Sequence, residues 1–494
     1  MTALNKKQKQ AAQQIDQFIL QNTSPFFYLL GYAGTGKTYL IGSIIKNLLL
    51  NNQIDQIYVC APTHQALNVI ESSIRSNIVQ LNDENKLVFM TIHKLLDFKP
   101  IIMTNDGSKI FKSIKESKFL KQIKSKLIVI DECSMISKLM VIELKKYAEL
   151  YPIKIIFMGD RKQLPPIGEP ESLVFTDIPR NYQHQILLDE IMRTKSPEIK
   201  EVCRIIRTWN RQDDLIKLLL PIHNRKTRAF KMYHKKSNYV ESNWFKYTIN
   251  KLDQKQIPII LPWRNETVNF YNNIIRNYLY KGADLTNFVV GDYVIFNNFH
   301  CSLELEYFYT SNMVEILEIA EKEDILFDWH QLIILNAKTK IDASYNTLIK
   351  KFMSQKNKFK INIFSIRRCN SEKITDMNKK YSIQAISRVD LASYELMINN
   401  IKEHIEYFFS EFHSTIMTNK LWKAYHTKLI DPFAQIKLGY STTIYKAQGS
   451  TFPNAIVDFD DLINLNINEF QLALYTAAGR AGDELRFIVP EKNS

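Results

Sequence analysis

An eight-residue segment near the N-terminus has the composition of a phosphate-binding loop. Gly31-Tyr-Ala-Gly-Thr-Gly-Lys-Thr38 matches the pattern GxxxxGK[ST] and lies between an apolar segment and a helical pattern. Its glycines would let backbone N–H groups surround a phosphate, and the helix N-terminus favours negative charge. We therefore predict that this loop binds ATP and Mg²⁺, with Thr38 at the metal and Lys37 both catalytic and in contact with the β- and γ-phosphates. The expected nucleotide contacts are Gly31, Gly34, Thr35, Gly36, Lys37 and Thr38.

Polar side chains follow two further apolar segments. Asp131 and Glu132 come directly after the residues LIVI, and Gln163 stands in the segment GDRKQLPP. A carboxylate at a strand end can complete the Mg²⁺ shell, and its neighbour can orient the attacking water. An amide can sense the γ-phosphate without carrying charge. We predict catalytic roles for all three residues and a Mg²⁺ contact for Asp131; an ordinary acidic pair and a polar turn are the alternatives.

The elements that must position these residues follow from the apolar pattern. Short apolar segments alternate with helical patterns in the first third of the chain, which predicts an α/β domain on a parallel sheet. Such sheets bind ligands at the carboxyl ends of their strands. The expected strands are Phe26–Leu30, Gln56–Cys60, Lys126–Ile130 and Lys154–Met158, and the expected helices include Thr38–Leu50 and Lys138–Leu150.

The rest of the chain changes character twice. From Phe288 to about Thr339, β-rich segments such as QLIILNAKT alternate with polar turns and predict a small barrel. Residues 340–435 have a helical pattern. The last 60 residues return to α/β character, with strands near Ala455–Phe459 and Leu485–Val489.

Composition and charge limit the class of protein. A chain of 494 residues predicts three or four domains. The net charge of +14 suggests a polyanionic partner such as nucleic acid, although a solvated basic surface would look the same. The five cysteines lie far apart, and we see no apolar leader and no run of 18 apolar residues. We expect a soluble, intracellular, cytoplasmic protein without a membrane partner.

Eight motifs occur in the order found in superfamily 1 helicases, and they most resemble the Dda-like/RecD-like branch, which includes phage DNA helicases. The resemblance implies two RecA-like parallel-sheet domains, an inserted β-hairpin called the pin, and an inserted small SH3-like β-barrel. It places domain 1A at 1–180 with the pin at about 89–112, domain 2A at 181–262 and 436–494, and domain 2B at 263–435. The motifs are GYAGTGKT, APTH, TIHKLL, IDECSM, GDRKQLPPI, MRT, TTIYKAQGSTF and LYTAAGRA.

The resemblance also implies roles for individual residues. Gln8 matches the glutamine that reads adenine, Gly449 a nucleotide contact, and Arg193 and Arg480 the two catalytic arginines directed at the γ-phosphate. Either arginine could instead be a surface cation. The implied DNA contacts, each of which could be an ordinary cap or turn residue, are Pro62, Thr63, His64, Thr91, His93, Phe98, Thr443, Lys446 and Gln448.

The chain departs from the family pattern at two positions. Tyr445 stands where motif V usually has a histidine, and Gly479 stands where motif VI usually has Ser or Thr. Two basic segments are further DNA candidates, Lys109–Lys126 and Arg225–Lys236, the first of them more typical of a solvated helix face.

These observations predict an ATP-dependent DNA helicase that translocates along single strands, by resemblance 5′ to 3′, and acts as a monomer. Its expected partners are single-stranded DNA and single-strand/duplex junctions, with a single-strand-binding protein or replisome component as a further candidate. A translocase that removes proteins with little unwinding, a nucleotide-switched loading module and an RNA substrate are the alternatives. The Lys-, Asn- and Ile-rich composition also fits a phage protein in a host cytoplasm.

Overall fold

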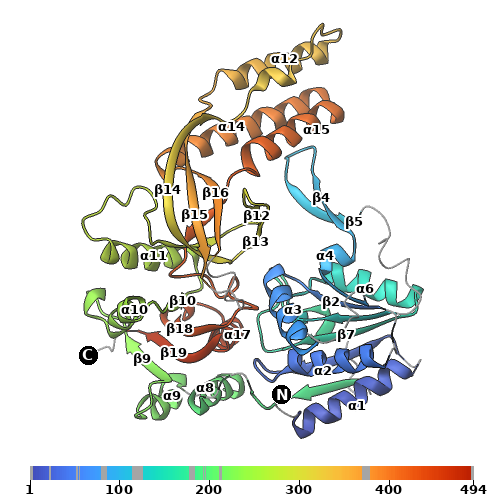
Figure 1. Ribbon diagram of the computed structural model, residues 1–494, viewed down its shortest axis with the longest axis vertical. Helices are drawn as coiled ribbons and strands as arrows, with labels where there is room; N and C mark the ends of the chain where they lie inside the picture. Colours follow the sequence, from blue (N-terminus) through green and yellow to red (C-terminus); the bar gives the residue numbers. More distant parts are fainter. Residues whose placement is uncertain are drawn as a thin grey trace. The chain divides into compact units, whose positions relative to one another are not determined.

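The computed structural model describes residues 4–21, 24–51, 54, 56–78, 86–113, 126–176, 184–192, 194, 196–210, 214–369 and 379–490. The chain forms two compact units (Figure 1). Unit 1 consists of Met1–Asp97, Ser113–Ile275 and Tyr440–Ser494, and unit 2 consists of Phe98–Lys112 and Arg276–Gly439.

The first domain of unit 1, domain 1, is built on a parallel sheet in the order β3-β2-β6-β7-β1-β8. Its strands are apolar on both faces because helices cover both sides; Leu127, Ile128, Val129 and Ile130 of β6 are all buried. The strands are β1 (Phe26–Gly31), β2 (Gln56–Ala61), β3 (Leu87–Thr91), β6 (Lys126–Ile130), β7 (Ile153–Gly159) and β8 (Gln185–Leu188). The helices are α1 (Lys6–Leu20), α2 (Lys37–Leu50), α3 (His64–Ile78), α4 (Ile92–Leu95), η2 (Cys133–Met135), α6 (Lys138–Leu150) and α7 (Leu173–Thr176).

The second domain of unit 1, domain 2, has a smaller parallel sheet in the order β10-β18-β19-β9. The strands are β9 (Phe230–His234), β10 (Ile259–Leu261), β18 (Phe452–Asp458) and β19 (Ala481–Val489). The helices are α8 (Pro197–Thr208), α9 (Leu215–His223), η3 (Tyr239–Glu241), α10 (Asn243–Asp253), α11 (Asn265–Leu279), α16 (Phe459–Leu462) and α17 (Ile467–Ala478). Two parallel sheets covered by helices confirm the expected pair of RecA-like domains.

Unit 2 contains an antiparallel sheet in the order β16-β15-β14-β11-β17, extended by the long β14–β15 pair. The strands are β11 (Tyr293–Phe296), β12 (His300–Cys301), β13 (Tyr307–Phe308), β14 (Met313–Ile325), β15 (Lys358–Arg368), β16 (Lys380–Ile386) and β17 (Ile436–Leu438), with β4 (Phe98–Ile102) and β5 (Lys109–Ser113) as a separate hairpin. The helices are η4 (Trp329–Leu332), α12 (Lys340–Met353), α14 (Arg388–Phe412), α15 (Thr415–Ala424) and the π-helix η5 (Tyr425–Ile430).

Three expectations about these elements were wrong. QLIILNAKT forms no strand; its first residues belong to η4, which Asp328 caps and which buries Trp329 and Leu332. The stretch 340–435 is not all helical, because it contains β15 and β16. The hairpin begins at Phe98 rather than near Phe89, which belongs to β3 in the parallel sheet.

Candidate functional site

The predicted phosphate loop joins β1 to α2. Gly34 and Gly36 both have a φ of +78°, which only glycine adopts readily, so the loop needs glycine at these positions. Lys37 starts α2, and its Nζ donates hydrogen bonds to the carbonyl oxygens of Gly31 at 2.6 Å and Tyr32 at 3.2 Å. The ammonium group therefore lies over the loop, where the charge of a bound phosphate would be balanced.

Gln8 lies against this loop although it is 23 residues before Gly31 in the sequence. Its Nε2 donates to the carbonyl oxygen of Thr35 at 3.2 Å, and its Oε1 accepts from the N–H of Asn5, the N-cap residue of α1. A Cβ on Gly36 would lie 2.8 Å from Gln8 Nε2. The structure thus brings Gln8 and the loop together, and the adenine-reading role of Gln8 stays a prediction.

The acidic pair follows β6. Glu132 has a φ of +50°, an uncommon conformation for a residue with a side chain, and its N–H donates to Asp131 Oδ1 at 2.8 Å. Within the described residues, no cluster of three or more His, Cys, Asp or Glu side chains is arranged to hold a metal without other ligands. Thr38 and Asp131 fit Mg²⁺ nonetheless, because this ion is usually held by one or two protein oxygens together with substrate phosphates.

Asp160, at the end of β7, connects the loop to domain 2. Its Oδ2 accepts hydrogen bonds from the Ala33 N–H at 2.9 Å and from the Tyr475 hydroxyl of α17 at 2.8 Å. Burial raises the pKa of Asp160, while the Lys37 charge and these hydrogen bonds act in the opposite direction. A tyrosine of domain 2 therefore takes part in fixing a backbone amide of the phosphate loop in domain 1.

Arg480, directly after α17, reaches Gln163 of domain 1. The side chain is 1% exposed, and its Nη2 donates to Gln163 Oε1 at 3.3 Å. Nη1 and Nε donate to the carbonyl oxygens of Ser450 and Thr476. Arg480 is therefore a buried interdomain residue and not a surface cation. Arg193 lies outside the described residues.

Close packing against the phosphate loop explains why position 479 is a glycine. A Cβ at Gly479 would lie 3.1 Å from the Cβ of Ala33 in the phosphate loop, which is tighter than ordinary van der Waals contact. The absence of a side chain lets the end of α17 approach the loop closely.

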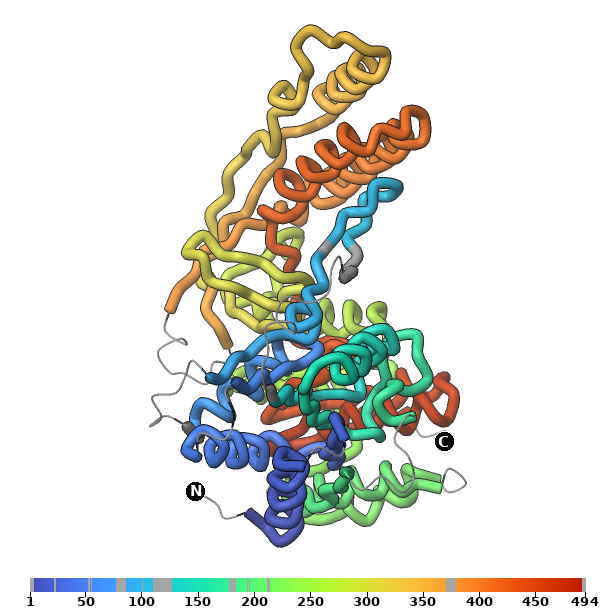
Figure 2. Tube along the Cα trace, turned by 90° about the vertical axis from the view of Figure 1, so that its right-hand side faces the viewer, coloured from blue at the N-terminus to red at the C-terminus, as the bar shows by residue number. Residues whose placement is uncertain are grey.

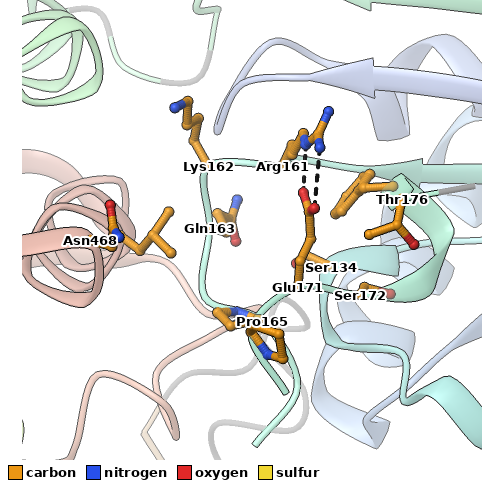
Figure 3. A pocket seen from close by; sticks show the side chains of 12 residues that line it. Ser134, Arg161, Lys162, Gln163, Pro165, Glu171, Ser172, Thr176 and Asn468 are labelled. Carbon is orange, nitrogen blue, oxygen red and sulfur yellow. Dashed lines mark hydrogen bonds and ion pairs between the residues drawn. The ribbon is translucent and has the colours of Figure 1, made fainter. Parts of the chain in front are cut away.

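Gln163 also borders a hollow of about 450 Å³. Figure 3 shows Arg161 and Lys162 on the same loop and Asn468, from the start of α17, facing it. Arg161 is held by Glu171 through two hydrogen bonds of 2.5 and 3.1 Å. The loop that carries Gln163 is thus anchored at Arg161 and contacted by domain 2.

The expected DNA contacts of domain 1 lie at one edge of its sheet. Pro62, Thr63 and His64 follow β2, and Thr91 and His93 come at the end of the neighbouring β3. Partial burial of the imidazole lowers the pKa of His64 and of His93, and the nearby Lys94 charge lowers that of His64 further. At neutral pH these groups are therefore mostly uncharged.

Three of the predicted threonines have structural roles as caps. Thr63 Oγ1 accepts from the Ala66 N–H, Thr91 Oγ1 from the Lys94 N–H, and Thr443 Oγ1 from the Lys446 N–H, at 3.2, 3.3 and 3.4 Å. Capping fixes each hydroxyl in place and does not exclude a second contact, so the DNA role of these residues stays a prediction.

The segment 448–450 contacts domain 1. Gln448 is buried, and its Nε2 donates to the carbonyl oxygen of Leu164 at 3.3 Å. A Cβ on Gly449, whose φ is +77°, would lie 3.3 Å from Ala66 of α3. The DNA role of Gln448 and the nucleotide role of Gly449 stay predictions, because these observed contacts are between the two domains.

In unit 2, the hairpin β4–β5 lies beside α15 (Figures 1 and 2), and it also contacts η5. Trp422 Nε1 donates to the Thr104 carbonyl oxygen at 3.0 Å, and His426 Nε2 lies 2.9 Å from the Gly107 carbonyl oxygen. Lys109 forms an ion pair with Asp431 at 2.8 Å. Phe98, an expected DNA contact, is buried at the start of β4. The hairpin is thus held at its turn and along one strand.

The DNA role of the two basic segments stays a prediction. In Arg225–Lys236, Arg225 pairs with Glu201, Lys235 pairs with Asp460, and Lys231 binds two carbonyl oxygens, so these charges support the edge strand β9. Of Lys109–Lys126, residues 114–125 lie outside the described residues, and Lys109–Ser113 is strand β5, not helix.

Sequence reasoning missed the link between Asp160 and Tyr475. Both stand inside the quoted motifs, but a contact across 315 positions has no signal in the sequence.

Within the described part of the chain, no helix is both long and apolar enough to cross a bilayer.

Comparison with known proteins gives two family matches. A model of an AAA domain matches residues 14–169, and a model of the UvrD-like helicase C-terminal domain matches residues 438–488. The uncharacterized protein R530 of Acanthamoeba polyphaga mimivirus is 50% identical over 98% of this chain and 99% of its own length.

Helicases are among the more distant relatives. The RecBCD subunit RecD of Buchnera aphidicola is 27% identical over 50% of this chain and 43% of its own length, and the ATP-dependent DNA helicase PIF1 of Emericella nidulans is 27% identical over 36% and 24%. The crystal structure of Pif1 helicase from Candida albicans covers 99% of this chain and 95% of its own, with 16% identity and a TM-score of 0.47.

Proposed function

This chain belongs to the Pif1/RecD-like branch of superfamily 1 helicases and is an ATP-hydrolysing DNA helicase, and we propose that it moves 5′ to 3′ along single-stranded DNA and separates duplex DNA at a junction. The direction rests on the resemblance of its motifs. The observation that most supports a motor is the contact of Arg480 with Gln163, because it brings an arginine of one domain to the nucleotide side of the other.

The proposed division of labour at the nucleotide follows from the positions of the residues. Gln8 would read adenine, Lys37 would balance phosphate charge, and Glu132 would orient the attacking water. Thr38 and Asp131 would hold Mg²⁺, which shields the phosphate oxygens when bound. Arg480 would stabilise the negative charge that develops during transfer.

Closure of the two domains would couple hydrolysis to movement. Tyr475 and Arg480 lie at opposite ends of the same short segment, and each contacts domain 1. A shift of α17 would therefore act on the phosphate loop and on Gln163 together. The loops after β2 and β3 and the segment around Thr443 would hold the DNA backbone and pass it along during each cycle.

The hairpin favours strand separation over protein removal without unwinding. A wedge must resist the force of the motor, and β4–β5 is fixed to α15 and η5 by hydrogen bonds and an ion pair. A base-pair step contributes about 1.4 kcal/mol of stacking, so a loose wedge would slip rather than open the duplex.

A nucleotide-switched loading module is the second candidate. It would have little use for an arginine that acts on the transition state. The ATPase rate with and without oligo-dT tests this: a motor is stimulated by the oligomer, whereas a switch hydrolyses slowly in both conditions. Displacement of streptavidin from a biotin at the 3′ end but not the 5′ end would support the direction, and oligo-U in place of oligo-dT tests RNA.

We further propose that the protein works as a monomer on single-stranded DNA and junctions. A single-strand-binding protein or replisome component is a candidate partner. Sedimentation of the protein with and without a tailed duplex tests the monomer, and added single-strand-binding protein tests the partner.

A further inference from the structure

Two aromatic side chains of domain 2 lie together beside the expected DNA contacts Thr443 and Lys446. The ring centroids of Trp263 and Tyr445 are 5.1 Å apart, and the ring planes are inclined at 48°. Both side chains are only partly buried. Because inclined rings do not cover each other as parallel stacked rings do, this pair keeps aromatic surface available for a ligand.

Hydrogen bonds hold the backbone on both sides of the pair. The Ile444 N–H donates to the Pro262 carbonyl oxygen at 3.1 Å. The Trp263 and Arg264 N–H groups both donate to Asp461 Oδ2, at 2.8 and 2.9 Å. The two rings are therefore carried on segments that are tied to each other and to α16.

The anchor itself is a buried carboxylate. The Asp461 side chain is 1% exposed, and burial would raise its pKa, but the hydrogen bonds from Arg264 and neighbouring groups hold the pKa below the usual value. Arg264 Nε donates to Oδ1 at 2.7 Å, while 57% of the Arg264 side chain remains exposed. A charged Asp461 thus positions Trp263 and also orients an exposed guanidinium group beside it.

The pair occupies the ligand-binding edge of the sheet. Trp263 follows the end of β10, and Ser441 pairs in parallel with Ile260 of the same strand shortly before Tyr445. The carboxyl ends of parallel strands are where open α/β sheets bind ligands. Flat aromatic faces with Lys446 and Arg264 nearby match a ligand that is both aromatic and anionic.

We propose that Trp263 and Tyr445 form a stacking platform, here called the aromatic platform, for one base of a single-stranded DNA. This inference rests on the proposed function and adds a base contact to its phosphate contacts. A base in a duplex is already stacked on its neighbours, so the platform selects unpaired strands. It does not read sequence, because every base has a π-face. Tyr445, which replaces the usual histidine of motif V, supplies the larger ring.

Binding measurements with two oligomers of equal length test the platform, one of oligo-dT and one in which tetrahydrofuran abasic residues replace the bases. Trp263→Ala and Tyr445→Ala should weaken oligo-dT binding about 5- to 100-fold and leave the abasic oligomer unchanged. Trp263→Phe should retain most of the affinity. The slope of log K against log salt should stay the same in all variants, because the phosphate contacts remain.

Intrinsic fluorescence gives an independent readout. Trp244, Trp329 and Trp422 are buried, so oligo-dT should quench Trp263 mainly, and Trp263→Phe should abolish the quenching while Trp209→Phe keeps it. Unchanged oligo-dT affinity in Trp263→Ala, or an equal loss on both oligomers, would overturn the platform. Failure of the proposed function would appear differently, as a wild-type ATPase that oligo-dT does not stimulate.

Discussion

The Tyr475 hydroxyl and the Asp160 carboxylate meet at 2.8 Å, and both contact the N–H of Ala33 in the phosphate loop. This three-way contact joins domain 2 to the loop without using any residue of the GK[ST] pattern. From this contact we predict that Tyr475 positions the phosphate loop for ATP hydrolysis.

Tyr475→Phe should lower the DNA-stimulated kcat/KM for ATP about 10- to 100-fold, the range expected for a lost hydrogen bond to a charged group. The benzene ring stays, so packing around α17 should be kept and the melting temperature should change little. Steady-state ATPase assays with calorimetry check this. A wild-type kcat/KM in Tyr475→Phe would show that this hydrogen bond has no role in ATP hydrolysis.

The same substitution should shift the pH profile. Burial raises the pKa of Asp160, and the Tyr475 hydrogen bond opposes that rise, so its removal should move the acid limb of kcat/KM to higher pH. The raised pKa also affects stability. Between the ordinary pKa of an unfolded aspartate and the raised pKa of Asp160 in the folded protein, the free energy of unfolding falls as pH increases. ATPase rates and urea unfolding from pH 4.5 to 8 measure both; an unmoved acid limb would assign it to another group.

Lys37→Ala should abolish hydrolysis and leave the protein folded. The Lys37 Nζ donates its hydrogen bonds to loop carbonyl oxygens within the described residues, so we expect folding to survive its loss. Lys46→Ala on the same helix is the matched control and should retain full activity. More than about a tenth of the wild-type rate in Lys37→Ala would contradict its phosphate role.

Arg480→Ala should hydrolyse ATP at least about 100-fold more slowly and still bind ATP and single-stranded DNA, since an arginine finger acts mainly on transition-state charge. Because Arg480 is buried, its loss also removes a hydrogen bond from the Gln163 Oε1 and from the Ser450 carbonyl oxygen, so thermal unfolding is measured alongside. Arg480→Lys keeps the positive charge, so this variant should recover thermal stability more fully than it recovers the rate of ATP hydrolysis. Normal kcat with lost nucleotide binding would assign Arg480 another role.

Gly107→Ala should uncouple unwinding from hydrolysis. A Cβ there would lie 2.3 Å from the Trp422 ring, so the hairpin turn and this ring of α15 must move apart. Gly282→Ala is the control, because Gly282 has a similar positive φ but nothing within 4 Å of its Cβ. We expect Gly107→Ala to keep DNA-stimulated ATPase and lose most duplex unwinding, measured by strand displacement. Full unwinding would remove the wedge role, and an equal loss of ATPase would mean that the hairpin supports folding.

Four strands of the first parallel sheet could be predicted closely because their signal is local, whereas β3, β8, β9 and β10 were not predicted, and β18 and β19 begin three and four residues before the predicted strands. Lys126–Ile130 has the expected bounds, and β7 differs from Lys154–Met158 by one residue at each end. Buried strands read as apolar runs between polar turns, whereas QLIILNAKT shows that an apolar run can also serve a short helix that packs in a core.

The contacts between distant parts of the chain could not be predicted. The positions of Lys37 and Gln8 followed from motifs, but the capping of Thr63 and the approach of Gly479 to Ala33 depend on how the elements pack. The pairing of Trp263 with Tyr445 likewise depends on β10 and the Ser441 segment lying side by side.

Strand separation on tailed duplexes is the most direct test of an ATP-driven helicase that moves 5′ to 3′. The wild-type protein with ATP should separate a duplex with a 5′ single-stranded tail and leave a 3′-tailed or blunt duplex intact, and Lys37→Ala should separate none of them. Oligo-dT-stimulated ATPase without separation of any duplex, or separation of the 3′-tailed duplex only, would contradict the account.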